Sequence, residues 1–293
     1  MGSLPRGWLL LVLSLGVASS WASITPGVAE VDLVFPRNES YSPSPLTPII
    51  FAIQNPNLLS SLNPRIGYYI EQQNVSAKER IYTSGFFELS KFNYTRSDPY
   101  FLYWSIGDLD VEGSFVIAWT IDMYNCSHDT EYGDLTFGYF GGRRYQSFFS
   151  TKNGTSLPDF VAATENDTCG QSPAHAVHVA DLLKVPSGQT WGDPTRILHP
   201  TPTWNPPRHT WSATSCATSA DLSPTPTPCN VKIDSSAAAS ISAALTSTAC
   251  ANPLRTGLTC PTTSSENAAP VGQSHVERPW ILAMGLLLAY GLA

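Results

Sequence analysis

The sequence predicts an all-β fold, an antiparallel immunoglobulin-like β-sandwich, followed by a Pro/Ser/Thr-rich linker and a short helix bounded by cysteines. Three observations lead to this prediction. Residues 28–150 contain short runs that are rich in β-branched and aromatic residues. Pro, Gly, Asn or Asp bounds each of these runs. No long segment with the 3.6-residue period of a helix interrupts them.

The expected strands follow one another along residues 23–190, which we assign to one β-sandwich domain. The first, 28–35, alternates until Pro36 ends it, and the second, 49–53, is an apolar run that stops before Asn55-Pro56. Further strands are expected at 65–71, 81–89, 100–106, 114–124 and 145–150. Residues 174–185 supply a last strand, with one helical turn at 181–184 as the alternative.

Composition limits the class of protein. The 293 residues are 42% hydrophobic, which is too apolar for wholesale disorder. The net charge is −7, whereas a nucleic-acid binder needs a basic face. No apolar run reaches the roughly 20 residues of a spanning helix, which argues against a protein with several membrane spans.

The N-terminus has the features of a secretory signal peptide over residues 1–22. Arg6 is the only charge, and an apolar stretch follows at 8–18. Ser20-Trp21-Ala22 is a cleavage triplet of the small-x-small type, so we expect cleavage after Ala22. Cleavage after Ser20 and an uncleaved membrane anchor are the alternatives.

The C-terminus has the pattern of a glycosylphosphatidylinositol (GPI) attachment signal. Residues 280–293 are apolar to the end of the chain, yet as a helix they would reach only about 21 Å, less than the ~30 Å hydrocarbon core. A polar spacer, 270–278, precedes them, and the small residues Asn267-Ala268-Ala269 precede the spacer. We expect lipid attachment at Asn267, with Ser264 or Ser265 as alternatives, a stalk at 261–267 and a removed propeptide at 268–293. A buried terminal helix or a plain tail anchor is the rival interpretation.

Six sequons for N-glycosylation lie within about 130 residues, which behind a signal peptide indicates a glycosylated extracellular domain. The residue after Asn125 is Cys126, and a disulfide there would compete with the addition of a glycan. The candidate asparagines are Asn38, Asn74, Asn93, Asn125, Asn153 and Asn166.

The even number of cysteines predicts three disulfides in an oxidising compartment. Six cysteines allow 15 pairings, of which we favour those that contain Cys126–Cys169. A zinc site is disfavoured because no two cysteines have the C-x2-C spacing. All six lie inside the expected mature chain: Cys126, Cys169, Cys216, Cys229, Cys250 and Cys260.

The composition changes after residue 190. Residues 191–228 are rich in Pro, Ser and Thr, which is typical of an extended linker that carries O-glycans, and Cys216 is expected to tie part of it to the domain. Residues 229–260 form a small segment with one helix candidate. Asp234 is a suitable N-cap, and Ile241 and Leu245 lie one turn apart on the same face.

Three stretches of the chain carry a resemblance to a known family. They are Val31-Asp-Leu-Val-Phe-Pro-Arg-Asn38, Pro48-Ile-Ile-Phe-Ala-Ile-Gln-Asn55, and Cys229-Asn-Val-Lys-Ile-Asp234 with its helix up to Cys250. The sequence resembles a family of secreted fungal proteins that is known only as a domain of unknown function, over roughly residues 25–250. This resemblance implies an extracellular or wall-associated fungal protein, and it implies no activity and no site residues.

Acidic residues and histidines provide weak candidates for catalysis or metal binding. Asp110 and Glu112 would share one face of an extended strand, at a spacing near that of glycosidase carboxylates, but a polar turn is the better interpretation. The segment from Asp108 resembles the start of a calcium loop, yet its twelfth position is Trp119. His175, His178 and His128 are expected to be exposed. We predict no catalytic, cofactor-binding or metal-binding residue.

Aromatic residues are dense at 100–104 and 137–145. In an alternating strand half of them fill the core, while the outward half can stack on sugar rings. Gly138, Gly141 and Gly142 indicate a turn that would present Tyr139 and Tyr145.

These observations predict a non-enzymatic, GPI-anchored glycoprotein of the cell surface or cell wall, which meets the membrane only through its lipid. Its role is expected to be adhesive or carbohydrate-binding, with cell-wall polysaccharide as the partner and no nucleic acid. The alternatives are a wall-modifying glycoside hydrolase or transglycosidase, and a freely secreted carbohydrate-binding or effector-like protein.

Overall fold

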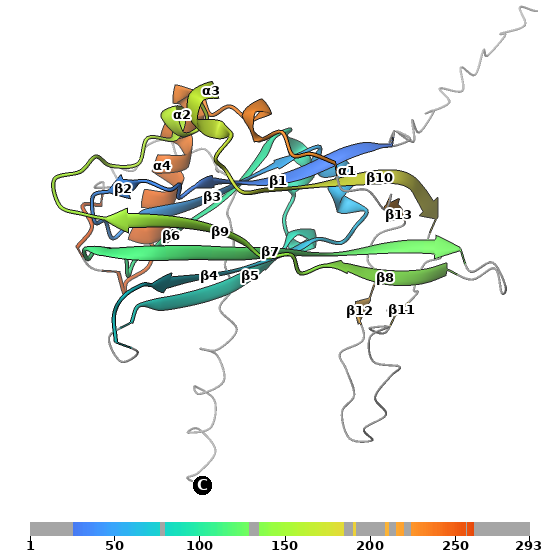
Figure 1. Ribbon diagram of the computed structural model, residues 1–293, viewed down its shortest axis with the longest axis horizontal. Coiled ribbons are helices and arrows are strands. Elements are labelled where there is room, and N and C mark those ends of the chain that lie inside the picture. The colour runs from blue at the N-terminus through green and yellow to red at the C-terminus, as the bar shows by residue number, and fades with distance from the viewer. Residues whose placement is uncertain are drawn as a thin grey trace, which may run out of the picture.

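The computed structural model describes residues 26–76, 80–128, 135–184, 190–191, 209–210, 215–219, 224–255 and 257–260. Two β sheets lie in layers (Figure 1). The first sheet has the strand order β13-β10-β1-β3-β6. The second has the order β2-β9-β7-β4-β5, with β8 also paired to β7. The mostly β fold predicted by the sequence is confirmed.

The expected strands are present, most of them within two residues of the expected bounds. The first sheet contains β1 (Gly27–Phe35), β3 (Thr47–Gln54), β6 (Tyr100–Ile106), β10 (Ala174–Lys184) and β13 (Ser215–Ser219). The second contains β2 (Ser40–Tyr41), β4 (Arg65–Gln72), β5 (Tyr82–Glu88), β7 (Gly113–His128), β8 (Leu135–Gly141) and β9 (Tyr145–Thr151). A further pair consists of β11 (Thr190–Trp191) and β12 (His209–Thr210).

Helices are few and mostly short. The α-helices are α1 (Pro56–Ser60), α2 (Phe160–Ala163), α3 (Asn166–Cys169) and α4 (Ser235–Cys250). Single 3-10 turns are Leu89–Lys91, Tyr94–Arg96 and Pro228–Asn230. Within the described ranges no helix is both long and apolar enough to cross a membrane.

The core lies between the two sheets and is joined by aromatic contacts. The Phe51 ring of β3 stacks on Trp104 of β6 with a centroid distance of 5.9 Å. It also meets Trp119 of β7 edge-on at 5.2 Å, so this one ring links the two layers. Around it pack inward-facing aliphatic residues such as Val31, Ile53 and Ile70, all fully buried.

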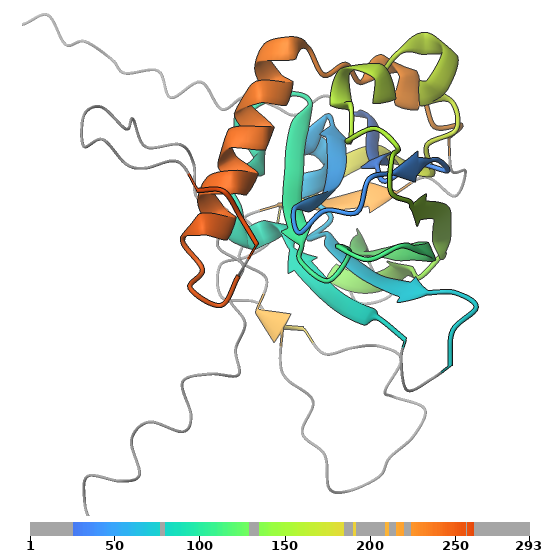
Figure 2. The same cartoon turned by 90° about the vertical axis from the view of Figure 1, so that its left-hand side faces the viewer.

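The first sheet is covered on its outer side as well. Every residue of β1 from Ala29 to Phe35 is buried, which in an alternating strand requires cover on both faces. The helix α4 packs along the β6 edge (Figure 2), α2 lies against β1, and Thr227 contacts Glu30 of β1. The predicted cap is confirmed, because Asp234 Oδ1 accepts a hydrogen bond of 2.8 Å from Ala237 N.

The segment after residue 228 therefore shares the core of the β sheets. Ile241 and Leu245, expected on one helix face, are both buried in the same hydrophobic cluster as the sheet residues. Val231 and Ile233 belong to that cluster too. Packing against the sheet supplies the stability that an Ala/Ser-rich helix lacks in isolation.

Two local features differ from the sequence prediction. Strand β2 pairs with β9 in parallel, so the expectation of a purely antiparallel fold is wrong there. Residues 215–219, placed in the linker, form β13 and pair with β10, which local composition does not reveal. The last strand expected at 174–185 is confirmed, because residues 181–184 continue β10 and do not form the alternative helical turn.

The glycines after Phe137 divide between a strand and a turn. Gly138 lies within β8, which the sequence analysis missed. Gly141 ends β8 and Gly142 begins the turn to β9, and their φ values are +140° and +75°. A Cβ atom at position 141 would lie 2.3 Å from the carbonyl oxygen of Ile121, so glycine is required.

Three disulfides form, as expected, but the favoured Cys126–Cys169 pairing is wrong. Cys126 of β7 pairs with Cys216 of β13, and their Cα atoms lie 6.0 Å apart. Cys169 of α3 pairs with Cys229, and Cys250 pairs with Cys260. Strand β13 brings Cys216 to β7, while Cys169 sits beside the turn at 228–230.

The predicted terminal signals lie outside the described residues. These are the signal peptide 1–22, the stalk 261–267, the attachment residue Asn267 and the propeptide 268–293. They remain predictions.

Candidate functional site

The outer side of the second sheet exposes an unusual set of aromatic rings. In β5 the exposed positions alternate with less exposed ones, and Tyr82 and Phe86 are each 58% exposed. In β4 the residue Tyr69 is half-buried on the same side, because Tyr69 pairs with Ser84 and Ser84 lies midway between Tyr82 and Phe86. The alternation of the strands thus places the three rings together.

Two of the three rings stack on each other, and small residues lie beside them in the sheet. Tyr69 and Tyr82 stack with a centroid distance of 6.0 Å and an interplanar angle of 24°. Gly67 pairs with Phe86, and Ala118 pairs with Tyr69, so each of these two rings has a small residue beside it on the neighbouring strand. A Cβ atom at Gly67 would lie 3.2 Å from Thr120 Oγ1, which leaves little room for a larger residue.

A second pair of rings extends this side of the sheet along β7 and β8. Tyr124 and Tyr139 are paired neighbours whose ring centroids lie 5.6 Å apart. Tyr139 Oη donates a hydrogen bond of 2.7 Å to Asp122 Oδ1. Burial, followed by this bond, raises the pKa of Tyr139 to about 12. We call Tyr69, Tyr82, Phe86, Tyr124 and Tyr139 the aromatic face.

Charged side chains are interleaved with the aromatic face. The guanidinium of Arg144 lies 5.6 Å from the ring centre of Tyr69, and that of Arg65 lies 5.3 Å from Phe86. Arg65 also pairs with Asp122 at 3.3 Å. Donors and acceptors therefore stand beside the rings, which is the arrangement that a ligand with hydroxyl groups requires.

The sequence analysis located this surface only in part. Tyr139 is on the aromatic face, as expected. Tyr145 instead turns toward the core, where it stacks on Trp119 at 4.6 Å and its hydroxyl lies 2.7 Å from His175 Nδ1. Within 100–104, Leu102 and Trp104 fill the core. The signal for Tyr82 and Phe86 was present in the alternation of residues 81–89.

The acidic candidates do not come together as a site. Asp110 and Glu112 lie exposed in the connection between β6 and β7, outside any strand. Glu112 Oε1 accepts a hydrogen bond of 2.6 Å from Asn153 N, and Asp108 is also exposed. In the described part of the chain, no group of three or more His, Cys, Asp or Glu could hold a metal ion.

The histidines are less exposed than expected. His175 and His178 lie on the strand β10 at an odd spacing and so face opposite sides of the sheet. Burial, together with the charge of Arg143, lowers the pKa of His175 and favours its neutral form. The side chain of His128 lies outside the described residues.

A buried carboxyl pair escaped the sequence analysis. Glu30 and Asp32 are two positions apart in β1, so both side chains lie on the outer side of the strand, and they are only 3% and 1% exposed. Both oxygens of Glu30 accept hydrogen bonds from Thr227 N, at 2.7 and 2.8 Å. Burial and the neighbouring Glu30 raise the pKa of Asp32 to about 9, so Asp32 holds a proton at neutral pH. The segment around Thr227 covers the pair, which gives it a structural role.

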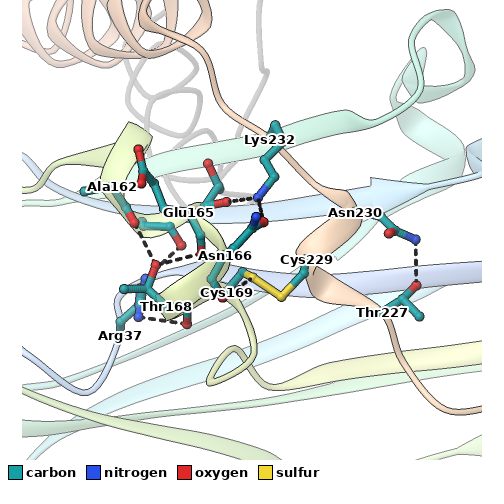
Figure 3. The surroundings of a disulfide bond; sticks show 12 residues. Arg37, Ala162, Glu165, Asn166, Thr168, Cys169, Thr227, Cys229, Asn230 and Lys232 are labelled. Atoms are coloured by element: carbon teal, nitrogen blue, oxygen red, sulfur yellow. Dashed lines mark hydrogen bonds between the residues drawn. A yellow bond between two sulfur atoms is a disulfide. The ribbon is translucent and has the colours of Figure 1, made fainter.

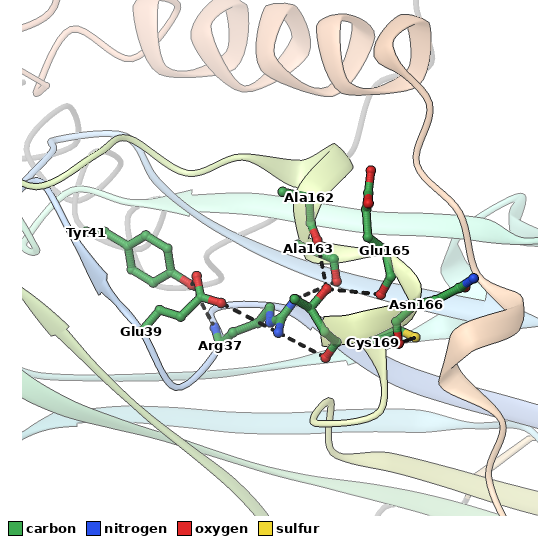
Figure 4. Close-up of polar contacts among 9 residues, drawn as sticks. Arg37, Glu39, Tyr41, Ala162, Ala163, Glu165, Asn166 and Cys169 are labelled. Atoms are coloured by element: carbon green, nitrogen blue, oxygen red, sulfur yellow. Dashed lines mark hydrogen bonds and ion pairs between the residues drawn. The ribbon is translucent and has the colours of Figure 1, made fainter.

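A second polar cluster joins the short helices to β1. Arg37, which is 4% exposed, donates to Ala163 O at 2.8 Å and to Thr168 O at 2.9 Å (Figure 4). Beside the Cys169–Cys229 disulfide, Lys232 Nζ donates to Asn166 Oδ1 at 2.7 Å (Figure 3). The two Arg37 contacts satisfy backbone carbonyls of α2 and α3, and the Lys232 contact ties α3 to the C-terminal segment.

The six predicted glycosylation sites differ in accessibility. Asn38, Asn74, Asn93, Asn153 and Asn166 are exposed. At Asn166 the carboxamide oxygen accepts from Lys232 Nζ, and among the described residues the side-chain nitrogen has no hydrogen-bond partner. At Asn125 the nitrogen itself donates to Ser219 Oγ at 3.0 Å, and Cys126 next to it is in a disulfide. The doubt raised at this sequon thus has a structural basis.

Comparison with known proteins adds a family and no activity. A family model described as a domain of unknown function, DUF7136, matches residues 24–260. No curated protein and no solved structure matches the chain. The match covers all the described β strands and α4, and the chain therefore belongs to the DUF7136 family.

Proposed function

We propose that the protein is a non-enzymatic, GPI-anchored glycoprotein of the cell surface or cell wall that binds cell-wall polysaccharide through its aromatic face. The observation that carries this proposal is the exposure of Tyr82 and Phe86 beside the stacked Tyr69 on one side of the second sheet. The finer description of the fold, an immunoglobulin-like sandwich, is also a proposal, supported by the two layered sheets.

Sugar rings match this surface in shape and in polarity. One side of a pyranose ring consists mainly of C–H groups, and an aromatic ring offers a flat apolar partner for it. The hydroxyl groups at the edge of the sugar then reach Arg65, Asp122 and Arg144 around the rings. An open face of this kind suits a chain that lies across the sheet, and an end-on ligand would need a deeper pocket.

The terminal signals support the location of the protein. An expected signal peptide, six sequons and an expected GPI signal agree on an extracellular address, and three disulfides are typical of that compartment. A phosphatidylinositol-specific phospholipase should release the protein from intact cells. A variant without the attachment site at Asn267 should carry no lipid and should leave no phospholipase-sensitive protein on the cells. Retention of the wild-type protein on treated cells would count against the anchor.

The aromatic face is tested by co-sedimentation of the purified glycoprotein with insoluble β-glucan and chitin. The double variant Tyr82→Ala/Phe86→Ala should weaken binding at least about tenfold, because it removes two stacking partners. Leu157→Ala is the matched control, since Leu157 is 67% exposed and lies outside the aromatic face. Equal binding by the wild-type chain and the double variant would exclude this face.

A further inference from the structure

A groove beside the aromatic face is bordered by two predicted glycosylation sites. It has a volume of about 410 Å³ and lies at the edge of the second sheet where β2 pairs with β9. Asn38 and Asn74 both line it, one from the connection between β1 and β2 and the other from the connection between β4 and β5. A glycan on either residue therefore starts inside the groove.

The floor of the groove is small and polar. The register places Ser40 of β2 beside Ser150 of β9, and Ser150 beside Ser114 of β7. All three serines line the groove, and the hydroxyls of Ser40 and Ser150 are 2.6 Å apart. Hydroxyl groups without bulk leave room above the sheet and can exchange hydrogen bonds with a sugar.

One wall of the groove is an exposed aromatic ring. Phe148 precedes Ser150 by two residues in β9, so both side chains point to the same side of the sheet. Its ring is 53% exposed, which is high for a phenylalanine that has no polar group to solvate. Of the three phenylalanines that line the groove, Phe148 is the exposed one, and its ring stands beside the serine floor.

The position of Asn38 fits this wall. Because β2 runs parallel to β9 with Ser40 beside Ser150, the chain before Ser40 runs back past Phe148. Ser150 N donates to Glu39 O at 3.0 Å, which continues the pairing to the residue after Asn38. Asn74 approaches from β4, which is separated from β9 by β7.

We propose that the groove holds the protein's own glycan, with the first N-acetylglucosamine on Asn38 packed against the ring of Phe148. The sugar covers the exposed ring and its hydroxyls face the serine floor, so that the glycan stabilises this edge of the sheet. The inference depends on glycosylation at Asn38 and is independent of polysaccharide binding by the aromatic face, which uses other residues.

The test is a double-mutant cycle on the glycosylated chain, read as the midpoint of thermal unfolding. Asn38→Gln and Phe148→Ala should each lower the midpoint by about 2–4 °C, and the double variant should lower it no further than either one alone. Asn74→Gln is the matched control, and its effect should add to that of Phe148→Ala.

Two further measurements distinguish the effect of the first sugar from the effect of the asparagine side chain itself. On a chain in which Asn38 is the one sequon left intact, trimming with an endoglycosidase that leaves one N-acetylglucosamine should preserve the midpoint, whereas complete removal with an amidase should lower it as far as Asn38→Gln does. Protons of that sugar should also show ring-current shifts in the NMR spectrum, which Phe148→Leu abolishes. Additive effects of Asn38→Gln and Phe148→Ala, or an Asn38 without a glycan in mass spectra, would overturn the proposal, while binding to β-glucan and chitin would be unaffected.

Discussion

At the scale of single residues, the buried pair Glu30 and Asp32 links folding to pH. The ordinary pKa of an aspartate is near 3.8, and in the folded protein that of Asp32 is about 9. Between these values the folded state holds one proton more than the unfolded state. The free energy of unfolding therefore falls as pH rises through this window, by at most about 1.4 kcal/mol per pH unit.

Replacing Asp32 by asparagine should remove this dependence. The amide cannot ionise, and it can still accept the hydrogen bond that Gln54 Nε2 donates to Asp32 Oδ2 over 2.8 Å. We expect Asp32→Asn to come closest to the stability of the wild-type chain near pH 4 and to exceed it increasingly toward pH 9, as measured by urea unfolding at several pH values.

The matched control is Glu30→Gln, which disturbs the carboxylate that accepts from Thr227. It should be less stable than the wild-type chain at pH 5 as well. If the stability of Asp32→Asn and of the wild-type chain ran parallel from pH 5 to 9, the raised pKa of Asp32 would be incorrect.

The sequence predicts residue roles unevenly. Alternation along β5 predicts that Tyr82 and Phe86 face one way, yet only the register with β4 brings Tyr69 beside them. Tyr145 has the same local pattern as an exposed aromatic, but packing on Trp119 turns it toward the core. The hydrogen bond from Thr227 to Glu30 spans 197 residues and leaves no local signal.

At the scale of elements, the helix α4 and its cap show how much of an element can be predicted from the local sequence. Asp234, the alanines and the spacing of Ile241 and Leu245 predict a helix and its buried face. They do not predict that this face closes the first sheet. Strands β8 and β13 were missed for the related reason that each depends on a neighbouring strand, β7 or β10.

The contact of α4 with the sheet should carry much of the stability. Ile241→Ala removes a side chain that is 3% exposed and should lower the free energy of unfolding by about 2–5 kcal/mol. Chemical denaturation of the disulfide-intact chain measures this change.

Ser240→Ala, an exposed neighbour on the same helix, is the control and should change stability by less than about 0.5 kcal/mol. An equally small effect of Ile241→Ala would show that α4 does not close the first sheet.

At the scale of the whole molecule, the two sheets differ in what they leave accessible. The first sheet is enclosed by the core on one side and by α4, α2 and the segment around Thr227 on the other. The second sheet keeps the aromatic face on its outer side. The disulfide between Cys126 and Cys216 holds β7 of the second sheet to β13 of the first, across 90 residues of sequence.

Hydrogen exchange of the intact glycoprotein, with and without soluble β-gluco- and chito-oligosaccharides, tests the proposed binding surface most directly. Backbone amides of β4 and β5 should become more protected in the presence of the bound sugar, and Tyr82→Ala/Phe86→Ala should abolish this protection. Protection confined to α4 and the first sheet, or no binding to either class of oligosaccharide, would contradict the assignment of the aromatic face as the polysaccharide-binding surface.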